Sequence, residues 1–167
     1  MGLNQFRPNM HMVFTGNPGS AKTTVARLLS EILNSEGILS SGEFVECGRA
    51  DLVGKYVGCT APTIKKKFRH AEGGILFIDE AYTLAPVSQA GDRDTQGAQA
   101  LEKLMKRMED DRGKFVVIAA GYRTEMDNLF RVMPGFKSRF NYFLDIDDYT
   151  PEQLYEIMLI FAKEKNL

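Results

Sequence analysis

Cysteines and long apolar runs are both scarce in this sequence. The 167-residue chain has only two cysteines, Cys47 and Cys59, and two cysteines do not make the disulfide framework of a small secreted protein. No apolar run reaches the about 18 residues that a membrane-spanning helix requires. The N-terminus also lacks the charged, apolar and small-residue order of a secretory signal. We therefore expect a protein of the reducing cytoplasm with no membrane partner.

An excess of either charge is missing as well. The formal net charge is −1 and the isoelectric point is about 6.1, so the chain has no general electrostatic attraction to nucleic acid. The basic segment 64–70 (IKKKFRH) is an exception. At helical spacing Ile64 and Phe68 share a buried side and leave the lysines in solvent, which favours a solvated helix face over a nucleic-acid patch. His11 and His70 have no metal-ligand spacing with the cysteines, and we expect no zinc site.

Short β-rich runs alternate with longer stretches of helical period along the chain. The length and the 44% hydrophobic content suit one globular domain with a core. Brief runs rich in Val, Ile and Phe are typical of buried parallel strands, and they lie at residues 11–15, 44–47, 74–79, 114–120 and 142–146. Helical patterns cover residues 23–37, 61–72 and 95–111. This alternation predicts an α/β fold with a doubly wound, five-stranded parallel sheet.

The apolar positions of the first helical pattern fall on one face. These positions are Val25, Leu28, Leu29 and Ile32, and Gly37 provides a stop after them. The second pattern has Pro62 near its first turn. The third has apolar residues at helical spacing, namely Leu101, Leu104, Met105 and Met108. All three segments therefore have the pattern of helices that cover a sheet.

A further helical pattern begins after the fifth predicted strand. Thr150 fits an N-cap and Pro151 fits the first helical position. The apolar residues that follow form one face that needs a partner; they are Leu154, Ile157, Met158 and Phe161. We therefore expect an α/β core at residues 1–148 and the first helix of a second, truncated domain at residues 149–167.

The segment 16–24 (GNPGSAKTT) nearly matches the phosphate-binding loop G-x-x-x-x-G-K-[ST] and lies between a predicted strand and a predicted helix. In such a loop successive main-chain N–H groups surround an anion, and the following helix adds its N-terminal dipole. Lys22 would reach the β- and γ-phosphates of a nucleotide, and the Thr23 hydroxyl would bind Mg²⁺. The expected binding residues are Asn17, Pro18, Gly19, Ser20, Ala21, Lys22, Thr23 and Thr24.

Ala21 departs from this motif, because it stands where the second glycine belongs. A left-handed backbone there would cost an alanine roughly 1–2 kcal/mol. A right-handed backbone at the start of the helix would suit alanine well. Gly16 and Gly19 remain to form the turn, and we therefore predict the right-handed conformation for Ala21.

The third predicted strand ends in two carboxylates. Four apolar residues, 75–78, lead directly into Asp79 and Glu80, and ligands of open α/β sheets bind at the carboxyl ends of the strands. Asp79 would help to hold Mg²⁺, and Glu80 would orient or deprotonate the attacking water. A strand that ends in Asp-Glu is common by itself. Combined with the phosphate loop, it predicts phosphoryl transfer.

Arg139, in the segment 133–140 (MPGFKSRF), is a candidate for a further catalytic role beside Lys22, Asp79 and Glu80. An arginine stabilises the charge that spreads onto a γ-phosphate, either within its own chain or from a neighbouring molecule. From the residues alone, a surface arginine without a catalytic role is the simpler interpretation.

Five segments in this order resemble the AAA+ ATPases, and within them the CbbX and stage V sporulation protein K group: HMVFTGNPGSAKTTVARLL, ADLVGKYVG, GILFIDEAY, VVIAAGY and PGFKSRF. The resemblance implies a P-loop NTPase fold, the AAA+ large subdomain followed by the start of the helical lid. It implies that Lys22 and Thr23 match the Walker A residues and that Asp79 and Glu80 match the Walker B pair. Arg139 would then match the arginine finger that reaches into the next subunit's site.

The resemblance also implies a bacterial protein that assembles into a ring. Proteins of this family assemble as hexamers that hold ATP between neighbouring subunits. The segment 54–58 (GKYVG) matches the first pore loop, in which Lys55, Tyr56 and Val57 would grip a substrate polypeptide. The other interpretation of Tyr56 is a half-buried aromatic residue in a connecting loop. The expected activity is Mg²⁺-dependent ATP hydrolysis that remodels an unidentified protein substrate through a central pore.

Two other functions stay open. The same core serves DNA-directed motors and loaders, and a nucleotide-dependent scaffold would bind ATP with little turnover. Tyr122 stands where related proteins often carry a sensor asparagine, so its role is undecided. We expect this chain by itself to hydrolyse ATP slowly or not at all, because the family's active site also uses a lid and a neighbouring subunit.

Overall fold

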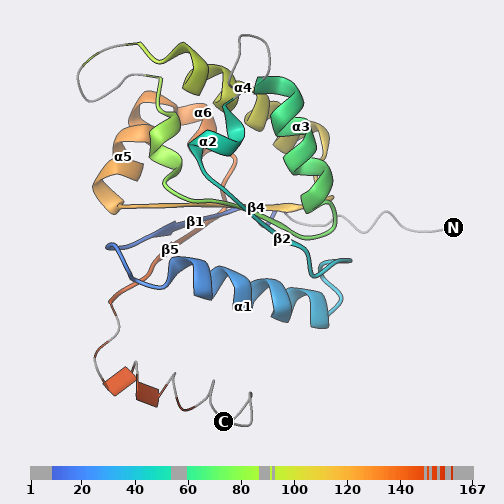
Figure 1. The fold of residues 1–167 in the computed structure, drawn as a ribbon, viewed down its shortest axis with the longest axis vertical. Helices are drawn as coiled ribbons and strands as arrows, with labels where there is room; N and C mark the ends of the chain where they lie inside the picture. The colour runs from blue at the N-terminus through green and yellow to red at the C-terminus, as the bar shows by residue number, and fades with distance from the viewer. Residues whose placement is uncertain are drawn as a thin grey trace, which may run out of the picture.

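The computed structural model describes residues 9–53, 60–86, 91, 93–148, 150, 152–153, 155–156 and 159. Figure 1 shows a sheet with helices on both of its faces. The sheet has five strands in the order β2-β3-β4-β1-β5, and each neighbouring pair is parallel. The predicted α/β fold with five parallel strands is confirmed.

The strands are short and coincide with the Val-, Ile- and Phe-rich runs of the sequence. They are β1 (Met12–Thr15), β2 (Phe44–Cys47), β3 (Ile75–Ile78), β4 (Val116–Gly121) and β5 (Tyr142–Asp145). All residues of β3 and β4 are buried, whereas all residues of β5, which lies at one edge, are exposed. Burial on both faces explains why the inner strands are continuously apolar.

The helices cover the two faces of the sheet unequally. In Figure 1, α1 (Lys22–Ser35) lies on one face, and the remaining labelled helices lie on the other. These are α2 (Arg49–Leu52), α3 (Thr60–Ala71), α4 (Thr95–Asp110), α5 (Arg123–Val132) and α6 (Pro134–Lys137). A 3-10 turn, η1 (Ala81–Leu84), follows β3. The predicted helices at residues 23–37, 61–72 and 95–111 correspond to α1, α3 and α4. The elements α2, α5, α6 and η1 were not predicted.

Alternation along the strands divides the core into two clusters. Val13 and Val117 pack on the side of α3, α4 and α5, whereas Phe14 and Ile118 pack on the side of α1. Successive strand residues point to opposite faces, so each strand contributes to both clusters. Of the described helices, none is long and apolar enough to cross a bilayer.

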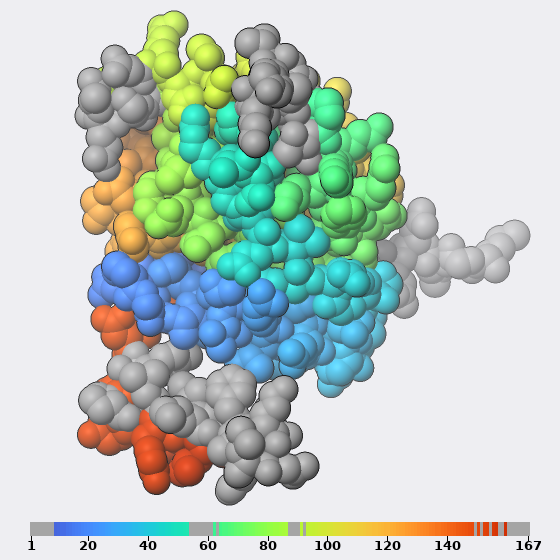
Figure 2. All heavy atoms as spheres, in the orientation of Figure 1, coloured from blue at the N-terminus to red at the C-terminus, as the bar shows by residue number. Residues whose placement is uncertain are grey.

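The buried face of α1 is narrower than the sequence pattern suggests. Val25 and Leu29 pack against the sheet, but Leu28 and Ile32 are 46% and 56% exposed. In Figure 2 the blue atoms of α1 form a band on the surface that faces the viewer. Its buried positions are Lys22, Ala26, Ser30 and Leu33. A helix touches a flat sheet along one row of residues, so half of the predicted apolar face points away from it.

The predicted division of the chain at residues 148 and 149 stays a prediction. Most of segment 149–167 lies outside the described residues. Within the segment, the described helical positions are 152–153, 155–156 and 159. Thr150 accepts the amide of Gln153 at 3.2 Å through its side-chain oxygen, as expected for an N-cap.

Candidate functional site: a phosphate loop facing two carboxylates

Glycines shape the loop between β1 and α1. Gly19 has a φ of +76°, which glycine adopts without steric cost. Gly16 donates its amide hydrogen to the carbonyl oxygen of Gly121, 3.3 Å away at the end of β4. A Cβ atom on Gly16 would lie 2.5 Å from the Ile146 carbonyl oxygen and 2.6 Å from the Ser20 hydroxyl. The loop therefore closes tightly onto the carboxyl edge of the sheet.

The backbone of Ala21 corrects the sequence prediction. Its φ is 59° and its ψ is 26°, which is left-handed and not right-handed. Ala21 is the N-cap of α1, and its carbonyl oxygen accepts the Val25 amide at 2.9 Å. An N-cap residue does not yet have helical angles, so the prediction placed Ala21 one position too far inside the helix. The methyl group costs this conformation about 1 kcal/mol or more.

The side chain of Lys22 folds back onto carbonyl groups of the phosphate loop. Nζ donates to the main-chain oxygens of Gly16 at 3.1 Å and Asn17 at 2.9 Å, and to the Ser20 hydroxyl at 3.1 Å. These three acceptors match the three protons of an ammonium group. Nζ also lies 5.8 Å from the centre of the Tyr122 ring. A buried positive charge is thus fixed at the start of α1, where the helix dipole also favours an anion.

One cavity of about 540 Å³ joins this loop to the ends of β3 and β4. It is lined by Pro18, Gly19, Ser20, Ala21, Lys22, Thr23 and Thr24, by Asp79 and Glu80, and by Gly121 and Tyr122. The volume falls within the range of small-molecule sites. The structure thus brings together every predicted binding residue except Asn17, whose side-chain amide donates to the Asp148 carboxylate at 3.2 Å.

The end of β3 positions the two carboxylates. Asp79 continues the pairing with β2 by donating its amide hydrogen to the Cys47 carbonyl oxygen at 2.9 Å. Its carboxylate accepts the Glu80 amide at 3.0 Å. Glu80 has a left-handed backbone with a φ of 49°. Its carbonyl oxygen accepts both the amide of Thr83 at 2.9 Å and the Thr83 hydroxyl at 2.7 Å. Surrounding hydrogen bonds therefore hold Glu80 in an unfavourable conformation.

The donor set of the cavity suits Mg²⁺. The Thr23 hydroxyl and the Asp79 carboxylate belong to residues that line the same cavity, and Mg²⁺ prefers oxygen ligands. Among the described residues, no group of three or more His, Cys, Asp or Glu side chains is arranged to hold a metal ion. Mg²⁺ usually binds through one or two protein groups together with phosphate oxygens and water, and this cavity offers that number of protein groups.

Arg139 lies at the other end of the sheet. Its guanidinium donates to the Gly135 carbonyl oxygen at 2.6 Å and to the Met105 carbonyl oxygen at 3.3 Å. It lines a separate cavity of about 140 Å³ together with His11, which precedes β1. The phosphate loop follows β1. The length of a strand therefore separates Arg139 from Lys22 of the same chain, and the structure does not bring Arg139 into the phosphate cavity.

Tyr122 lines the cavity and packs against Tyr82, a contact that the sequence did not predict. The rings of Tyr82 and Tyr122 lie 5.6 Å apart at an angle of 31°. A Cβ atom on Gly121 would lie 2.8 Å from the Tyr82 ring. Burial raises the pKa of Tyr82 to about 12, with smaller contributions from nearby groups, among them the Glu80 carboxylate and the hydrogen-bonded Tyr122. The sequence signal for this contact was the pair Gly121-Tyr122, directly after the predicted strand 114–120.

The predicted pore residues Lys55, Tyr56 and Val57 lie outside the described residues. Their role therefore stays a prediction. The described chain resumes with α3 at Thr60, where Ile64 and Phe68 are 1% and 3% exposed. This burial confirms the predicted apolar side of segment 64–70.

The parallel sheet, the strand–loop–helix unit and the carboxylates after β3 define the class of phosphate-loop nucleotide-binding proteins. Residues 12–147 match the family model described as "ATPase family associated with various cellular activities (AAA)". The chain belongs to this family. The resemblance stated from the sequence is thereby confirmed.

Known relatives place the chain in the expected group. Stage V sporulation protein K of Bacillus subtilis (strain 168) is 46% identical over 156 residues, which cover 93% of this chain and 47% of that protein. Protein CbbX of Cereibacter sphaeroides is 45% identical over 157 residues, 94% of this chain and 50% of that protein. The chloroplastic ribulose bisphosphate carboxylase/oxygenase activase of Cyanidioschyzon merolae is 44% identical over 165 residues, 99% of this chain and 55% of that protein.

The chain thus spans about half the length of these curated relatives. Because the relatives include a chloroplastic protein as well as bacterial ones, the similarity does not assign a bacterial source.

Proposed function

We propose that this chain is the ATP-binding and ATP-hydrolysing core of a cytoplasmic, ring-forming protein that remodels another protein. The observation that carries the proposal is the shared cavity, because it places Lys22 and the phosphate loop opposite Asp79 and Glu80. Phosphoryl transfer needs a phosphate cradle, a metal seat and an aligned nucleophile in one place. In this cavity the loop with Lys22 would form the phosphate cradle, Thr23 and Asp79 would seat the metal ion, and Glu80 would align the nucleophile.

Each group has a distinct proposed role. Lys22 and the loop amides bind the β- and γ-phosphates. Thr23 and Asp79 hold Mg²⁺, which when bound neutralises charge on the phosphates. Glu80 orients the attacking water and accepts its proton. Tyr122 walls the cavity beside Lys22, and this contact supports a role in positioning the lysine rather than a role as a hydrogen-bonding sensor.

The position of Arg139 supports action between subunits. Arg139 lies at the opposite end of the sheet from Lys22, so it serves an active site only as part of a neighbouring copy. Head-to-tail contacts form a ring when the rotation between subunits closes, and a closed hexamer is the form that we propose. It follows that a dilute single chain hydrolyses ATP slowly or not at all.

The proposed substrate is a protein that enters the ring's pore, gripped by Tyr56 with Lys55 and Val57. One relative is named as an activase of ribulose bisphosphate carboxylase/oxygenase, and its target is therefore a protein. This similarity supports a protein substrate for the present chain and does not identify it.

The proposal is tested with the Glu80→Gln variant of the full-length protein. We expect the variant to bind ATP as the wild type does, while hydrolysis falls about 100-fold or more through loss of the general base. Nucleotide binding is measured by calorimetry and hydrolysis by phosphate release. Glu102→Gln, a change at an exposed position of α4, is the matched control and should leave both unchanged.

Three outcomes would contradict the proposal. Absence of adenine-nucleotide binding to the full-length wild type would refute the site itself. Binding without hydrolysis by the assembled wild type would favour a nucleotide-dependent scaffold. If the Glu80→Gln ring binds ATP and captures DNA rather than a polypeptide crosslinked to Tyr56, a DNA-directed motor would replace the remodeller.

A further inference from the structure

The side chain of Arg49 joins three segments that are far apart in the sequence. Arg49 is the first residue of α2. Its Nη1 lies 2.5 Å from the Asp94 carboxylate, before α4, and donates to the Thr83 carbonyl oxygen in η1 at 2.7 Å. The side chains of Arg49 and Asp94 are 33% and 24% exposed. An arginine that bonds in two directions from a half-buried position holds its partners in a fixed geometry.

Asp94 is itself fixed on the α4 side of this connection. Its carboxylate accepts the Gly97 amide at 2.9 Å as the N-cap of α4, and its own amide donates to the Pro86 carbonyl oxygen at 2.8 Å. Burial raises the pKa of Asp94, but the hydrogen bonds from Arg49 and Gly97 outweigh burial and lower it overall. The carboxylate therefore stays charged opposite Arg49.

Gly97 makes room for the arginine. A Cβ atom on Gly97 would lie 2.8 Å from the Leu84 carbonyl oxygen and 3.0 Å from Nη1 of Arg49. The first turn of α4 thus lies directly against η1 and beside the Arg49 guanidinium. A larger residue at this position would push α4 away from η1.

Thr83 carries the connection to Glu80. Its amide and hydroxyl both donate to the Glu80 carbonyl oxygen, while its own carbonyl oxygen accepts from Arg49. A second cavity of about 440 Å³ is lined by residues of α2 and of the segment after β3, among them Arg49, Thr83, Asp79 and Glu80. The strained backbone of Glu80 is therefore supported through Thr83 by a residue of α2.

From this geometry we infer that Arg49 is a positioning residue that fixes Glu80 for hydrolysis by tying η1 to α2 and α4. This inference rests on the proposed catalytic role of Glu80.

The first test measures kcat and KM for ATP in the full-length Arg49→Gln protein. We expect kcat to fall about 10- to 100-fold, as for a misplaced catalytic group. KM and ADP affinity should stay within about twofold, because the phosphate loop is untouched. Arg49→Lys should retain more activity than Arg49→Gln, since it keeps the charge opposite Asp94 but lacks the planar fork.

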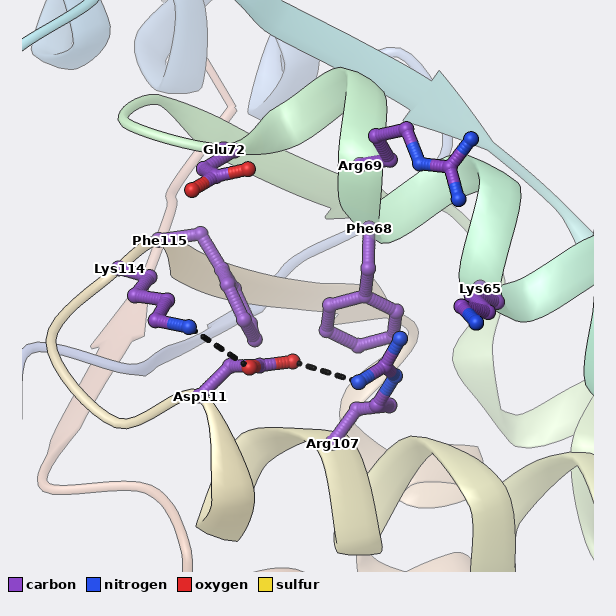
Figure 3. A pocket seen from close by; sticks show the side chains of 8 residues that line it. All are labelled: Lys65, Phe68, Arg69, Glu72, Arg107, Asp111, Lys114 and Phe115. Carbon is purple, nitrogen blue, oxygen red and sulfur yellow. Dashed lines mark hydrogen bonds and ion pairs between the residues drawn. The ribbon is translucent and has the colours of Figure 1, made fainter.

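A pair of comparable exposure at the other end of α4 supplies the control. Figure 3 shows Arg107 beside Asp111, at 3.1 Å. Their side chains are 31% and 18% exposed. Arg107→Gln removes a half-buried ion pair that is remote from Glu80 and lies at the end of one helix, where Asp111 also contacts Lys114 at 3.3 Å. Its kcat should match the wild type. Equal losses in Arg107→Gln and Arg49→Gln would assign the effect to general destabilisation and overturn the inference.

A double-mutant cycle tests the connection to α4. Asn caps a helix as well as Asp does, so Asp94→Asn removes the charge and keeps the cap. If both residues act through one network, the double variant Arg49→Gln/Asp94→Asn is no slower than Arg49→Gln alone. Additive losses would mean that Arg49 acts without Asp94.

Hydrogen exchange tests the same inference without relying on activity. In Arg49→Gln, the amides of residues 79–84 should exchange faster than in the wild type, whereas those of β4 should not change. Unchanged exchange at 79–84, or unchanged kcat in an active wild-type background, would refute the role of Arg49. An inactive wild type with faster exchange in Arg49→Gln would instead count against the proposed function and leave the structural connection in place.

Discussion

At the residue scale, backbone strain gathers around the phosphate cavity. Among the described residues, the non-glycine positions with positive φ are Ala21 and Glu80, and both line this cavity. Such conformations cost about 1 kcal/mol or more each and persist only where the surroundings impose them. Ala21 is held by its place at the start of α1, and Glu80 by the two hydrogen bonds from Thr83.

The conformation of Ala21 leads to a prediction about stability. Ala21→Gly should raise the free energy of unfolding by up to about 1 kcal/mol, because relief of the left-handed strain exceeds the entropy that glycine adds to the unfolded chain. Ala21→Val should lower it by about 1–2 kcal/mol, since a branched side chain is poorly tolerated at positive φ. Urea denaturation measures both. If the valine variant were as stable as the glycine variant, the left-handed assignment would be wrong.

At the scale of elements, a buried histidine connects the start of β1 to β4. His11 is 4% exposed, and its Nδ1 accepts the Val117 amide at 2.9 Å. Burial lowers the pKa of His11 to about 4, and the positive charge of Arg112 contributes a smaller part. The acceptor role of Nδ1 requires a neutral ring. Protonation therefore opposes the packing of these two strands.

This pKa predicts how stability depends on pH. Between about pH 6.5 and pH 4 the unfolded chain binds a proton at His11 that the folded chain does not bind, so stability falls as the pH is lowered through this window. The loss attributable to His11 is on the order of 3 kcal/mol. Denaturation of wild type and His11→Asn at several pH values isolates it, because the carboxylates titrate in both proteins. Parallel pH profiles for the two proteins would contradict the prediction.

At the scale of the whole molecule, the two ends of the sheet carry different residues. The carboxyl end holds the phosphate cavity, and the amino end holds Arg139 with His11. In the head-to-tail ring that we propose, the amino end of one subunit would face the cavity of the next. Each complete active site then needs Glu80 from one subunit and Arg139 from another.

Mixed rings test this arrangement. Full-length Arg139→Ala and Glu80→Gln proteins should each be inactive, but equimolar mixing should restore activity at about one quarter of the interfaces, those that combine an intact Glu80 with an intact Arg139. Mixing Glu80→Gln with Lys22→Ala should restore nothing, because both changes affect the same half of the site. Failure of the first mixture to exceed its components would exclude action of Arg139 between subunits.

Much of the site could be predicted from sequence because its parts are local. The phosphate loop, the strand that ends in Asp79 and Glu80, and the buried side of α3 are each encoded by about ten consecutive residues with a recognisable pattern. The direction of parallel strands then brings the loop and the carboxylates to one edge. The helices α5 and α6 are shorter, with 10 and 4 residues, and they were missed.

The sequence by itself determined the α/β class, the positions of the strands and which residues form the phosphate loop, because short-range periodicity and spacing specify them. Only the tertiary structure decided the left-handed turn at Ala21, the narrow buried row of α1, the separation of Arg139 from Lys22 and the contacts of Arg49. These features depend on which segments meet after folding. Contacts between residues far apart in the chain leave no local pattern, so packing had to reveal them.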